Sequence, residues 1–411
     1  MQFKKNLTYF IIASIISLIF YFLITKQLIY PTLFPIVKDG VINIFADWSV
    51  ILSANLCKTK VDVYIENPCD FWNRYHVYGN ILLNIPLIKE FPKFYYLVLP
   101  IIINFLFIYV VVTFFDFKKK FEYLTALPFI FSIPVLFVIE RANIDNLIFL
   151  IIFLISINKN LILNYFLIIL GTITKFYPIV SSIIFLFKRN LKKIIINLTF
   201  LVLIIFFILY FEIDSLKKIS ENSKQFSASA FLSFSFIGFV NHINDIKIVF
   251  QGKDYNWIKY IFILLILLVP IIFTLFSKVK FIFSDEKIKE LFSKNCFENR
   301  LYILSTTIVL VCYFSFSNYM YREIFFLGLI PWILSQKKLS NFNSFYSFYY
   351  YALCGKFFIS TILIYMYENH LKLFKPIATV TKHCLDFYII FIISLIFISS
   401  VYSLTKKLFN N

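Results

Sequence analysis

Long runs of apolar residues, separated by short basic or polar stretches, recur from one end of the chain to the other. Many of them are roughly 17 to 22 residues long, the length a helix needs to cross about 30 Å of hydrocarbon. The 411 residues are 60% hydrophobic, with a mean hydropathy of +0.83. A single water-soluble core cannot bury that much apolar surface, so lipid must form part of the solvent of this protein.

The apolar runs predict helices, because they are continuous where a membrane β-barrel would alternate apolar and polar residues. We therefore expect an all-α, polytopic membrane protein with about 12 transmembrane or half-spanning helices, forming a single membrane domain over residues 1–411. The expected segments are 7–25, 94–115, 122–139, 146–157, 160–174, 177–187, 194–212, 258–277, 301–317, 323–335, 345–366 and 384–404.

Basic residues gather just beyond the ends of these runs, at every second connection. This distribution is typical of cytoplasmic loops, so it places both termini in the cytoplasm and the protein in the inner (cytoplasmic) membrane. It also explains the net charge of +18 without a nucleic-acid partner. The first run shows no small-residue cleavage site, and we expect it to be retained as a span. The basic clusters are Lys4 and Lys5, Lys118 to Lys120, Lys188, Arg189, Lys192 and Lys193, Lys278 and Lys280, Lys337 and Lys338, and Lys406 and Lys407.

The segments 146–157, 177–187 and 323–335 are too short to cross a bilayer alone, so we expect half-helices or broken helices. Irregular backbone at membrane depth is tolerated where it is buried within protein or lines a water-filled cavity. These segments therefore predict a polar site in the outer half of the membrane.

Two connections are long, and both are expected on the outer side: residues 26–93 and 213–257. In the first, apolar positions between Ile36 and Leu56 predict an interfacial helix that carries Asp47 near headgroup level. The second is a candidate lid or further interfacial helix. Cys57 and Cys69 share the first loop and can form a disulfide if the compartment is oxidising.

Charged residues that do not mark a cytoplasmic loop stand out, because charge at membrane depth is costly. They are Asp47, the segment Glu140 to Asp145, Lys175, and the pair Arg322 and Glu323, all expected at the outer ends of spans. Together they suit a phosphate-bearing substrate and a hydroxyl acceptor, since cations hold the phosphate and a carboxylate takes the proton.

Each of these residues also has a structural interpretation. Asp47 can be a solvated loop acid, and Lys175 can extend along the helix to the membrane interface. Arg141 can pair with Glu140, and Arg322 with Glu323 or with the Glu140 and Arg141 segment.

Several familiar site motifs are absent from the sequence. It has no glycine-rich phosphate loop, no GxSxG and no CxxC, and only seven glycines. An activity that uses a cytosolic nucleotide is therefore not expected. The histidines are scattered, so we expect no metal site; they are His76, His242, His370 and His383.

Five segments together carry a resemblance to a known family. They are FADWSVILSANLCKTKVDVY, with Asp47 and the element Asp62-Val63-Tyr64, then YHVYGNILLNIP, ERANIDNLIFLIIFL, GTITKFYPIVSSIIFLFKR and SNYMYREIFFLGLIPWIL. The chain resembles the membrane glycosyltransferases of the GT-C superfamily, most closely glycosyltransferase family 87, the DUF2029-like mannosyltransferase type that uses a polyprenyl-phosphate mannose donor. It departs from that pattern in lacking a Gly before the Asp-x-Tyr element, in reducing a Pro pair to Pro86, and in separating Lys175 from Pro178 by two aromatic residues.

The resemblance implies an inverting transfer of mannose or another hexose from a polyprenyl-phosphate donor to a glycan or glycolipid acceptor. It makes Asp47 the general base and assigns the lipid phosphate to Arg141, Lys175 and Arg322, with no cofactor. Trp48, Tyr64 and Tyr177 are expected to stack on the sugar or the prenyl chain. Further candidates are Asp62, Asn143, Asp145, Glu323 and His76.

Two other functions fit the same features. A flippase for lipid-linked glycans also needs basic residues along a cavity, and a polysaccharide polymerase or ligase also uses prenyl-linked glycans and large outer loops. Asp47 distinguishes an enzyme from a flippase, because only an enzyme needs a general base there.

Overall fold

The computed structural model describes most of the chain. The described residues are 2–25, 37–38, 41–42, 45–85, 94–117, 120–188, 191–223, 234–235, 282, 285–315, 320–339, 345–368 and 374–409. The expected span 258–277 lies outside them, as does most of the expected outer loop 213–257.

The chain divides into two compact units where the sequence predicted one domain. Unit 1 comprises residues 1–179 and 200–226, and unit 2 comprises residues 180–199 and 227–411. Both units are helical, and the described residues also include one small pair of strands in unit 1.

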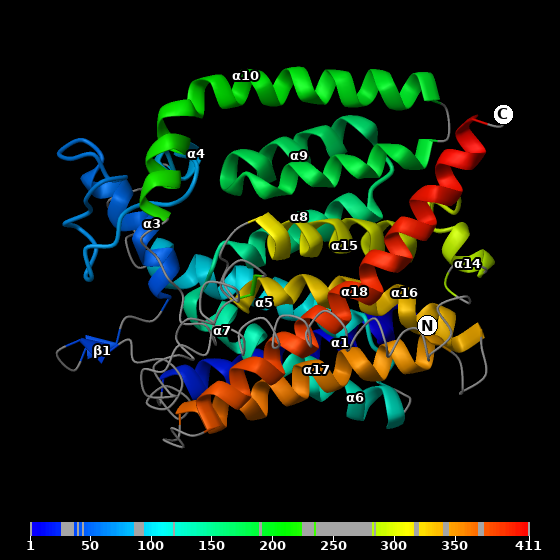
Figure 1. Cartoon of the computed structure of the whole chain (residues 1–411). Coiled ribbons are helices and arrows are strands. Elements are labelled where there is room, and N and C mark those ends of the chain that lie inside the picture. Colours follow the sequence, from blue (N-terminus) through cyan, green and yellow to red (C-terminus); the bar gives the residue numbers. More distant parts are fainter. Residues whose placement is uncertain are drawn as a thin grey trace, which may run out of the picture. The chain divides into compact units, whose positions relative to one another are not determined.

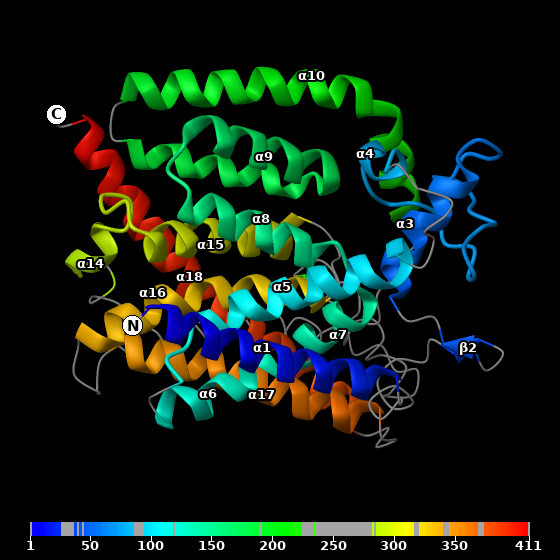
Figure 2. The ribbon, with the colours of Figure 1, turned by 180° about the vertical axis from the view of Figure 1, so that it is seen from behind.

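Unit 1 consists mainly of helices, with one short pair of strands (Figure 1). Helix α1 packs along α5 (Figure 2), and the Tyr9 hydroxyl donates to the Phe115 carbonyl at 3.1 Å. Helix α8 packs on both α5 and α9. Its elements are α1 (Gln2–Thr25), β1 (Val37–Lys38), β2 (Val41–Ile42), α3 (Ala46–Cys57), α4 (Asn80–Leu83), the π-helix η1 (Phe94–Val98), α5 (Leu99–Thr113), α6 (Lys120–Ile130), α7 (Ile133–Arg141), α8 (Asp145–Ile157) and α9 (Leu161–Lys175).

Local sequence explains several ends of these helices. Asn160 caps α9, its side chain accepting from the amides of Ile162 and Leu163. Helix α7 begins with Pro134 in its first turn, where the missing amide proton of proline costs nothing. Two elements are shared between the units: the 3₁₀ helix η2 (Tyr177–Lys188) and α10 (Leu191–Ser223).

Unit 2 is built on close contacts of α15 with η4 and of α17 with α18. Gly328 in η4 lies against Ser305 in α15, and a Cβ atom there would come within 1.9 Å of the Ser305 hydroxyl. Tyr302 and Trp332 pack beside each other in the core, with ring centroids 4.3 Å apart. Its other elements are α14 (Glu286–Lys289), α15 (Phe297–Ser315), the 3₁₀ helix η4 (Met320–Leu329), α16 (Ile330–Leu339), α17 (Phe345–Glu368) and α18 (Phe374–Phe409).

Four charged side chains meet in the interior of unit 2, each with no exposed surface. Lys356 from α17 pairs with Glu323 from η4, and with Asp386 from α18 at 3.2 Å. Lys382, also from α18, lies 3.0 Å from Glu323 and 2.8 Å from Asp386. We call these four residues the buried quartet. Its charges alternate and sum to zero, which limits the cost of removing them from water.

Four helices of the described residues are long and apolar enough to cross a membrane. A fifth span is possible if Leu124–Ile130 and Ile133–Arg141, bent by 45° at their junction, count as one. The chain is therefore a helical membrane protein, while twelve spans and cytoplasmic termini stay predictions. The four spans are Asn6–Thr25, Phe94–Thr113, Leu191–Ile219 and Thr381–Leu408.

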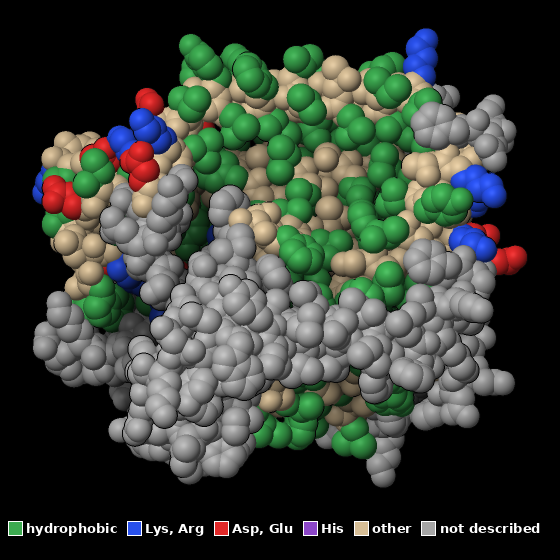
Figure 3. All heavy atoms as spheres, viewed as in Figure 1, with side chains coloured by type: hydrophobic (Ala, Val, Ile, Leu, Met, Phe, Trp, Pro, Cys, Tyr) green, Lys and Arg blue, Asp and Glu red, His purple; other side chains and the backbone are tan. Residues whose placement is uncertain are grey.

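The surface of α10 within unit 1 changes character along its length. Phe206 and Tyr210 are 71% and 68% exposed, and Figure 3 shows hydrophobic side chains along this helix. At its far end, near α3 and α4, charged side chains replace them, among them Lys218 paired with Asp62. An exposed apolar helix that ends in a charged patch is suited to a lipid environment with a polar boundary.

Two predicted segments differ from the structure. The interfacial helix expected over residues 36–56 begins only at Ala46, because Val37–Lys38 and Val41–Ile42 pair as antiparallel strands and Phe45 adopts a left-handed conformation (φ 63°). The span expected to end at residue 212 continues as α10 to Ser223, so the first part of the expected loop 213–257 is helical.

The segments predicted to be short or broken are so in the structure. Residues 146–157 lie in the 13-residue helix α8. Residues 177–187 and the first part of 323–335 form 3₁₀ helices, which are tighter and usually short.

Candidate functional site

Asp47 lies in the first turn of α3, at a helix start that the neighbouring helix α7 positions. The amide of Phe45 donates to the Glu140 carbonyl at 3.1 Å, which ties the entry of α3 to the last turn of α7. A carboxylate in the first turn also interacts favourably with the positive end of the helix dipole. Asp47 is therefore held at a defined distance from the residues that follow Glu140.

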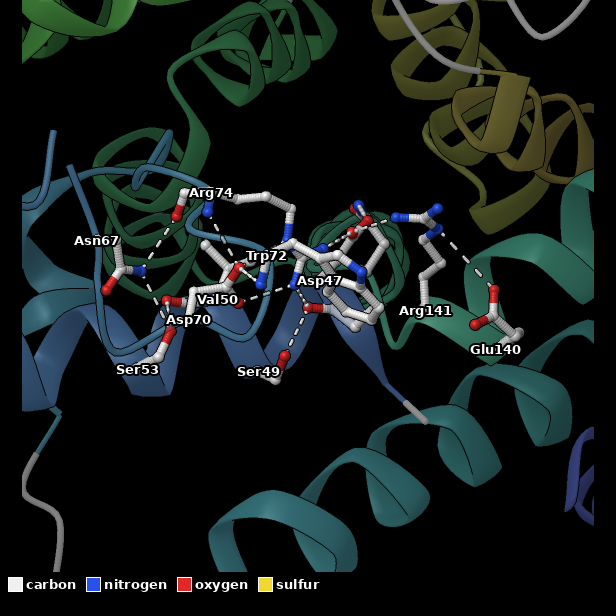
Figure 4. A network of polar contacts seen from close by, with 12 residues as sticks. Asp47, Ser49, Val50, Ser53, Asn67, Asp70, Trp72, Arg74, Glu140 and Arg141 are labelled. Atoms are coloured by element: carbon white, nitrogen blue, oxygen red, sulfur yellow. Dashed lines mark hydrogen bonds and ion pairs between the residues drawn. The ribbon is translucent and has the colours of Figure 1, made fainter. Parts of the chain in front are cut away.

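Three side chains surround the Asp47 carboxylate (Figure 4). Arg141 donates from Nη1 to Oδ1 at 3.0 Å, and Asn143 donates from Nδ2 to Oδ2 at 2.6 Å. Arg74 approaches from the opposite side of Asp47, with Nη1 3.7 Å from Oδ1. The side chains of Asp47, Arg74 and Arg141 are 15%, 20% and 21% exposed, so this part of the site is open to a ligand.

Asn143 connects Asp47 to a second, more buried group. The Lys175 ammonium donates to the Asn143 side-chain oxygen at 3.2 Å and to Asp145 at 2.6 Å. The Tyr177 hydroxyl donates to the same Asp145 oxygen at 2.6 Å. The Asp145 side chain has no exposed surface and that of Lys175 is 10% exposed. Five of the expected site residues therefore share one network with Asp47: Arg141, Asn143, Asp145, Lys175 and Tyr177.

Each of the three turns that supply this network contains a residue with positive φ. Phe45 precedes Asp47, Ala142 (φ 44°) separates Arg141 from Asn143, and Phe176 (φ 22°) separates Lys175 from Tyr177. Such conformations are unfavourable for residues other than glycine and are typical of functional sites. The backbone at these turns is shaped to bring polar side chains together at the cost of local strain.

The loop before α4 holds the end of α9 in place. The Gly79 amide donates to the Thr174 carbonyl at 3.3 Å, and a Cβ atom at this position would come within 1.8 Å of the Ile173 carbonyl oxygen. Only glycine allows this approach. The contact positions the residue that follows, Lys175.

Arg74 and Asp70 were not among the residues selected from the sequence. Asp70 receives two hydrogen bonds from the Arg74 guanidinium, from Nε at 3.0 Å and from Nη2 at 2.9 Å. A usable signal was the scarcity of arginine in a chain that otherwise uses lysine, because a guanidinium is needed where two hydrogen bonds must be made in one plane. The arginines of the chain are Arg74, Arg141, Arg189, Arg300 and Arg322.

The expected aromatic residues have other contacts. The Trp48 indole donates to the Tyr95 carbonyl at 2.9 Å, and its ring lines a recess together with Asn104 and Asn143. Tyr177 contributes its hydroxyl to Asp145. Tyr64 instead hydrogen-bonds Asn80 at 2.8 Å, and burial raises its pKa to about 12. Stacking of these rings on a sugar stays a prediction.

Asp62 and His76 do not join the described contacts of Asp47. Asp62 pairs with Lys218 of α10. His76 is buried between the rings of Tyr64 and Tyr78, and burial lowers its pKa to about 4, so it is neutral at pH 7. Within the described part of the chain, no group of three or more His, Cys, Asp or Glu residues is placed to hold a metal ion.

Arg322 and Glu323 belong to η4 of unit 2. Glu323 does not pair with Arg322, the structural alternative considered above, because Lys356 and Lys382 of the buried quartet hold its carboxylate. The part of Arg322 in the candidate site stays a prediction.

Cys57 and Cys69 form a disulfide that joins the end of α3 to the loop carrying Asp70 and Arg74. Replacing both cysteines by Ser is expected to lower the free energy of unfolding by about 2–4 kcal/mol, because the open chain gains conformational freedom. It should also speed tryptic cleavage after Lys58, Lys60 and Arg74, which mass spectrometry can follow.

A matched control for the disulfide is Cys296→Ser, which removes an exposed free thiol in unit 2. It should change neither the free energy of unfolding nor the cleavage of the loop. Maleimide labelling of all six cysteines in the denatured, unreduced protein would contradict the disulfide.

No protein-family model matches the chain, and neither the curated proteins nor the solved structures contain a match.

Proposed function

We propose that this protein is a membrane glycosyltransferase of the GT-C type, which transfers a hexose from a polyprenyl-phosphate donor to a hydroxyl group of a glycan or glycolipid acceptor. The observation that carries the proposal is the partly exposed pairing of Asp47, at the start of α3, with Arg141 at the end of α7 and with Arg74. It places a proton acceptor beside cations suited to a phosphate, at the end of apolar helices.

In the proposed reaction, the acceptor oxygen attacks the anomeric carbon from the side opposite the phosphate, and its proton passes to an Asp47 oxygen. The bond between the anomeric carbon and the phosphate oxygen breaks, and its electron pair stays on the phosphate. The configuration at the anomeric carbon is therefore inverted. Charge grows on the phosphate in the transition state, where a preorganised guanidinium is most effective.

The contacts suggest different roles for the exposed part of the network, around Arg141, and for its buried part, around Lys175. Arg141 is exposed enough to contact a phosphate, whereas Lys175 is already paired with Asp145 in a buried position. We therefore assign Lys175, Asp145 and Tyr177 to the support of Asn143, which orients the Asp47 carboxylate. In this proposal Lys175 acts through Asn143 and does not bind the phosphate directly. The resemblance, in contrast, assigns Lys175 to the phosphate.

The donor class is tested with the purified protein in lipid vesicles. Membranes of the expression host supply the acceptor, and radiolabelled hexoses are offered as polyprenyl-phosphate sugars or as nucleotide sugars. We expect protein-dependent incorporation of label from at least one polyprenyl-phosphate hexose and none from nucleotide sugars when prenyl phosphate is absent. Incorporation from nucleotide sugars alone, or from no donor, would contradict the proposal.

A carrier gives a different result in the same vesicles. It moves the intact lipid-linked sugar between leaflets, so the sugar becomes accessible to an enzyme added outside while its bond to phosphate stays unbroken. Recovery of all label as intact donor, with protein-dependent movement between leaflets, would favour a flippase.

A further inference from the structure

The carboxylate of Asp47 lies between two guanidinium groups. Nη1 of Arg141 is 3.0 Å from Oδ1 and Nη1 of Arg74 is 3.7 Å from the same oxygen. Figure 4 shows Arg74 and Arg141 on either side of Asp47. Two guanidinium groups that face one anionic oxygen form an arrangement that also suits a phosphate, which can accept hydrogen bonds from both at once.

The position of Arg74 is set by contacts that leave Nη1 directed at Asp47. Nε and Nη2 both bind the Asp70 carboxylate, and Nη2 also donates to the Ala46 carbonyl at 2.8 Å. The guanidinium carbon lies 4.7 Å from the centre of the Trp72 ring. The Asp70 carboxylate is itself fixed in position. Its side chain is 1% exposed and accepts hydrogen bonds from the backbone amides of Trp72 and Arg74. These contacts give Arg74 one orientation before any ligand arrives.

We propose that Arg74 and Arg141 form a clamp for a single phosphate group, and that the Asp47 carboxylate occupies the gap between them until the phosphate enters. The proposal rests on the proposed function and adds to it a second phosphate-binding residue, Arg74. Asp70 is then a positioning residue, which acts only through Arg74.

Arg74 and Arg141 can pair in turn with the Asp47 carboxylate and with the phosphate, because both partners carry negative charge. A phosphate that binds the two guanidinium groups draws them from Asp47, whose carboxylate is then free to face the acceptor hydroxyl. During transfer Asp47 takes up the acceptor proton while negative charge grows on the leaving phosphate. The arginines therefore keep a negative partner throughout the reaction.

The disulfide attaches the loop that carries Arg74 to α3, the helix that carries Asp47. Cys69 directly precedes Asp70 in the sequence and is bonded to Cys57 at the end of α3, the same helix that begins beside Asp47. The loop is thus attached to α3 at the disulfide and through the bond from Arg74 to Ala46. This attachment keeps the distance between Arg74 and Asp47 independent of the rest of the loop.

The clamp is tested by direct binding, without the transfer reaction. Binding of farnesyl phosphate to the detergent-solubilised protein is measured by microscale thermophoresis, with farnesol as the neutral analogue and inorganic phosphate as the anion without a prenyl chain. We expect Arg74→Gln to weaken farnesyl phosphate binding roughly tenfold to a hundredfold and to leave farnesol binding unchanged, since a charge-assisted pair of hydrogen bonds is lost.

Two further variants separate charge from geometry. Arg74→Lys keeps the charge but cannot bind two oxygens in one plane, so we expect an intermediate affinity. Asp70→Asn leaves Arg74 intact and should weaken binding less than Arg74→Gln. Lys218→Gln is the matched control, because it removes an exposed cation of unit 1 whose partner is Asp62, and it should bind farnesyl phosphate as the original protein does.

The outcomes distinguish the clamp from the proposed function. Equal farnesyl phosphate affinity in the original protein and in folded Arg74→Gln and Arg74→Lys variants would overturn the clamp, even where sugar transfer is observed. Binding that depends on Arg74 in a protein that transfers no sugar would uphold the clamp and remove the transferase proposal. Inorganic phosphate that binds as tightly as farnesyl phosphate, and equally depends on Arg74, would uphold the clamp with a soluble phosphate as its ligand.

Discussion

Replacing Asp47 by Asn is expected to lower the rate of sugar transfer from a polyprenyl-phosphate donor by about 10²–10⁴-fold, the usual contribution of a general base. Asn has nearly the same shape and can still accept a hydrogen bond from Arg141, so the site should keep its structure. It cannot take the proton of the acceptor hydroxyl. Initial rates at saturating donor, with thermal unfolding of the same samples, measure the effect.

Asp62→Asn is the matched control for this substitution. Asp62 lies in the same outer segment of unit 1 and also pairs with a cation, Lys218, but makes no described contact with Asp47. We expect its transfer rate to stay within about twofold of the original protein, since exposed ion pairs contribute little. Undiminished sugar transfer by a folded Asp47→Asn variant would remove Asp47 from catalysis.

Replacing Lys356 by Met is expected to destabilise unit 2 by about 3–5 kcal/mol, because it leaves the two acids of the buried quartet with one cation. The double variant Lys356→Met, Glu323→Gln restores a net charge of zero, and we expect it to recover most of the lost stability. Lys382→Met and its combination with Asp386→Asn should behave in the same way. These differences are measured by thermal unfolding in detergent, with the loss of monodisperse protein as the readout.

Lys294→Met provides the comparison on the surface of unit 2. Lys294 also pairs with a glutamate, Glu290, but its side chain is 66% exposed. Its loss should cost less than about 1 kcal/mol. If the stability lost in each double variant equalled the sum of the losses in its two single variants, the four residues would act independently and not as a neutral network.

The parts of the candidate site that could be predicted from the sequence are those at the ends of apolar segments. Asp47, Arg141 and Lys175 each stand out because a charged residue adjoins a run of apolar residues, where charge is costly. The same contrast identified the short segments that the structure shows as α8 and the two 3₁₀ helices.

Pairs formed inside irregular loops could not be predicted in this way. Arg74 and Asp70 are four residues apart in a loop without periodicity, and only the fold shows that Arg74 reaches Asp47. The sequence Asp39-Gly40 between Val37–Lys38 and Val41–Ile42 is a recognised signal for a hairpin, but the helical pattern of the neighbouring residues obscured it.

The buried quartet joins residues from three elements that are far apart along the chain. The spacing between Glu323, Lys356 and Asp386 follows no local pattern, so their pairing depends on how η4, α17 and α18 pack. A signal was nevertheless present in Lys356, which interrupts the apolar segment 345–366 near its middle. A lysine at that place requires a buried partner of opposite charge.

Apart from Arg74, which lies in the loop between α3 and α4, the polar residues around Asp47 lie where helices begin or end: the start of α3, the junction of α7 and α8, and the end of α9. The middle sections of these helices carry no part of the site. Their apolar residues can therefore be exchanged for others that suit a thicker or thinner bilayer, or a different lipid composition, while the spacing of Asp47, Arg141 and Lys175 is retained. The same chemistry could in this way be adapted to different membranes through substitutions that never touch a substrate.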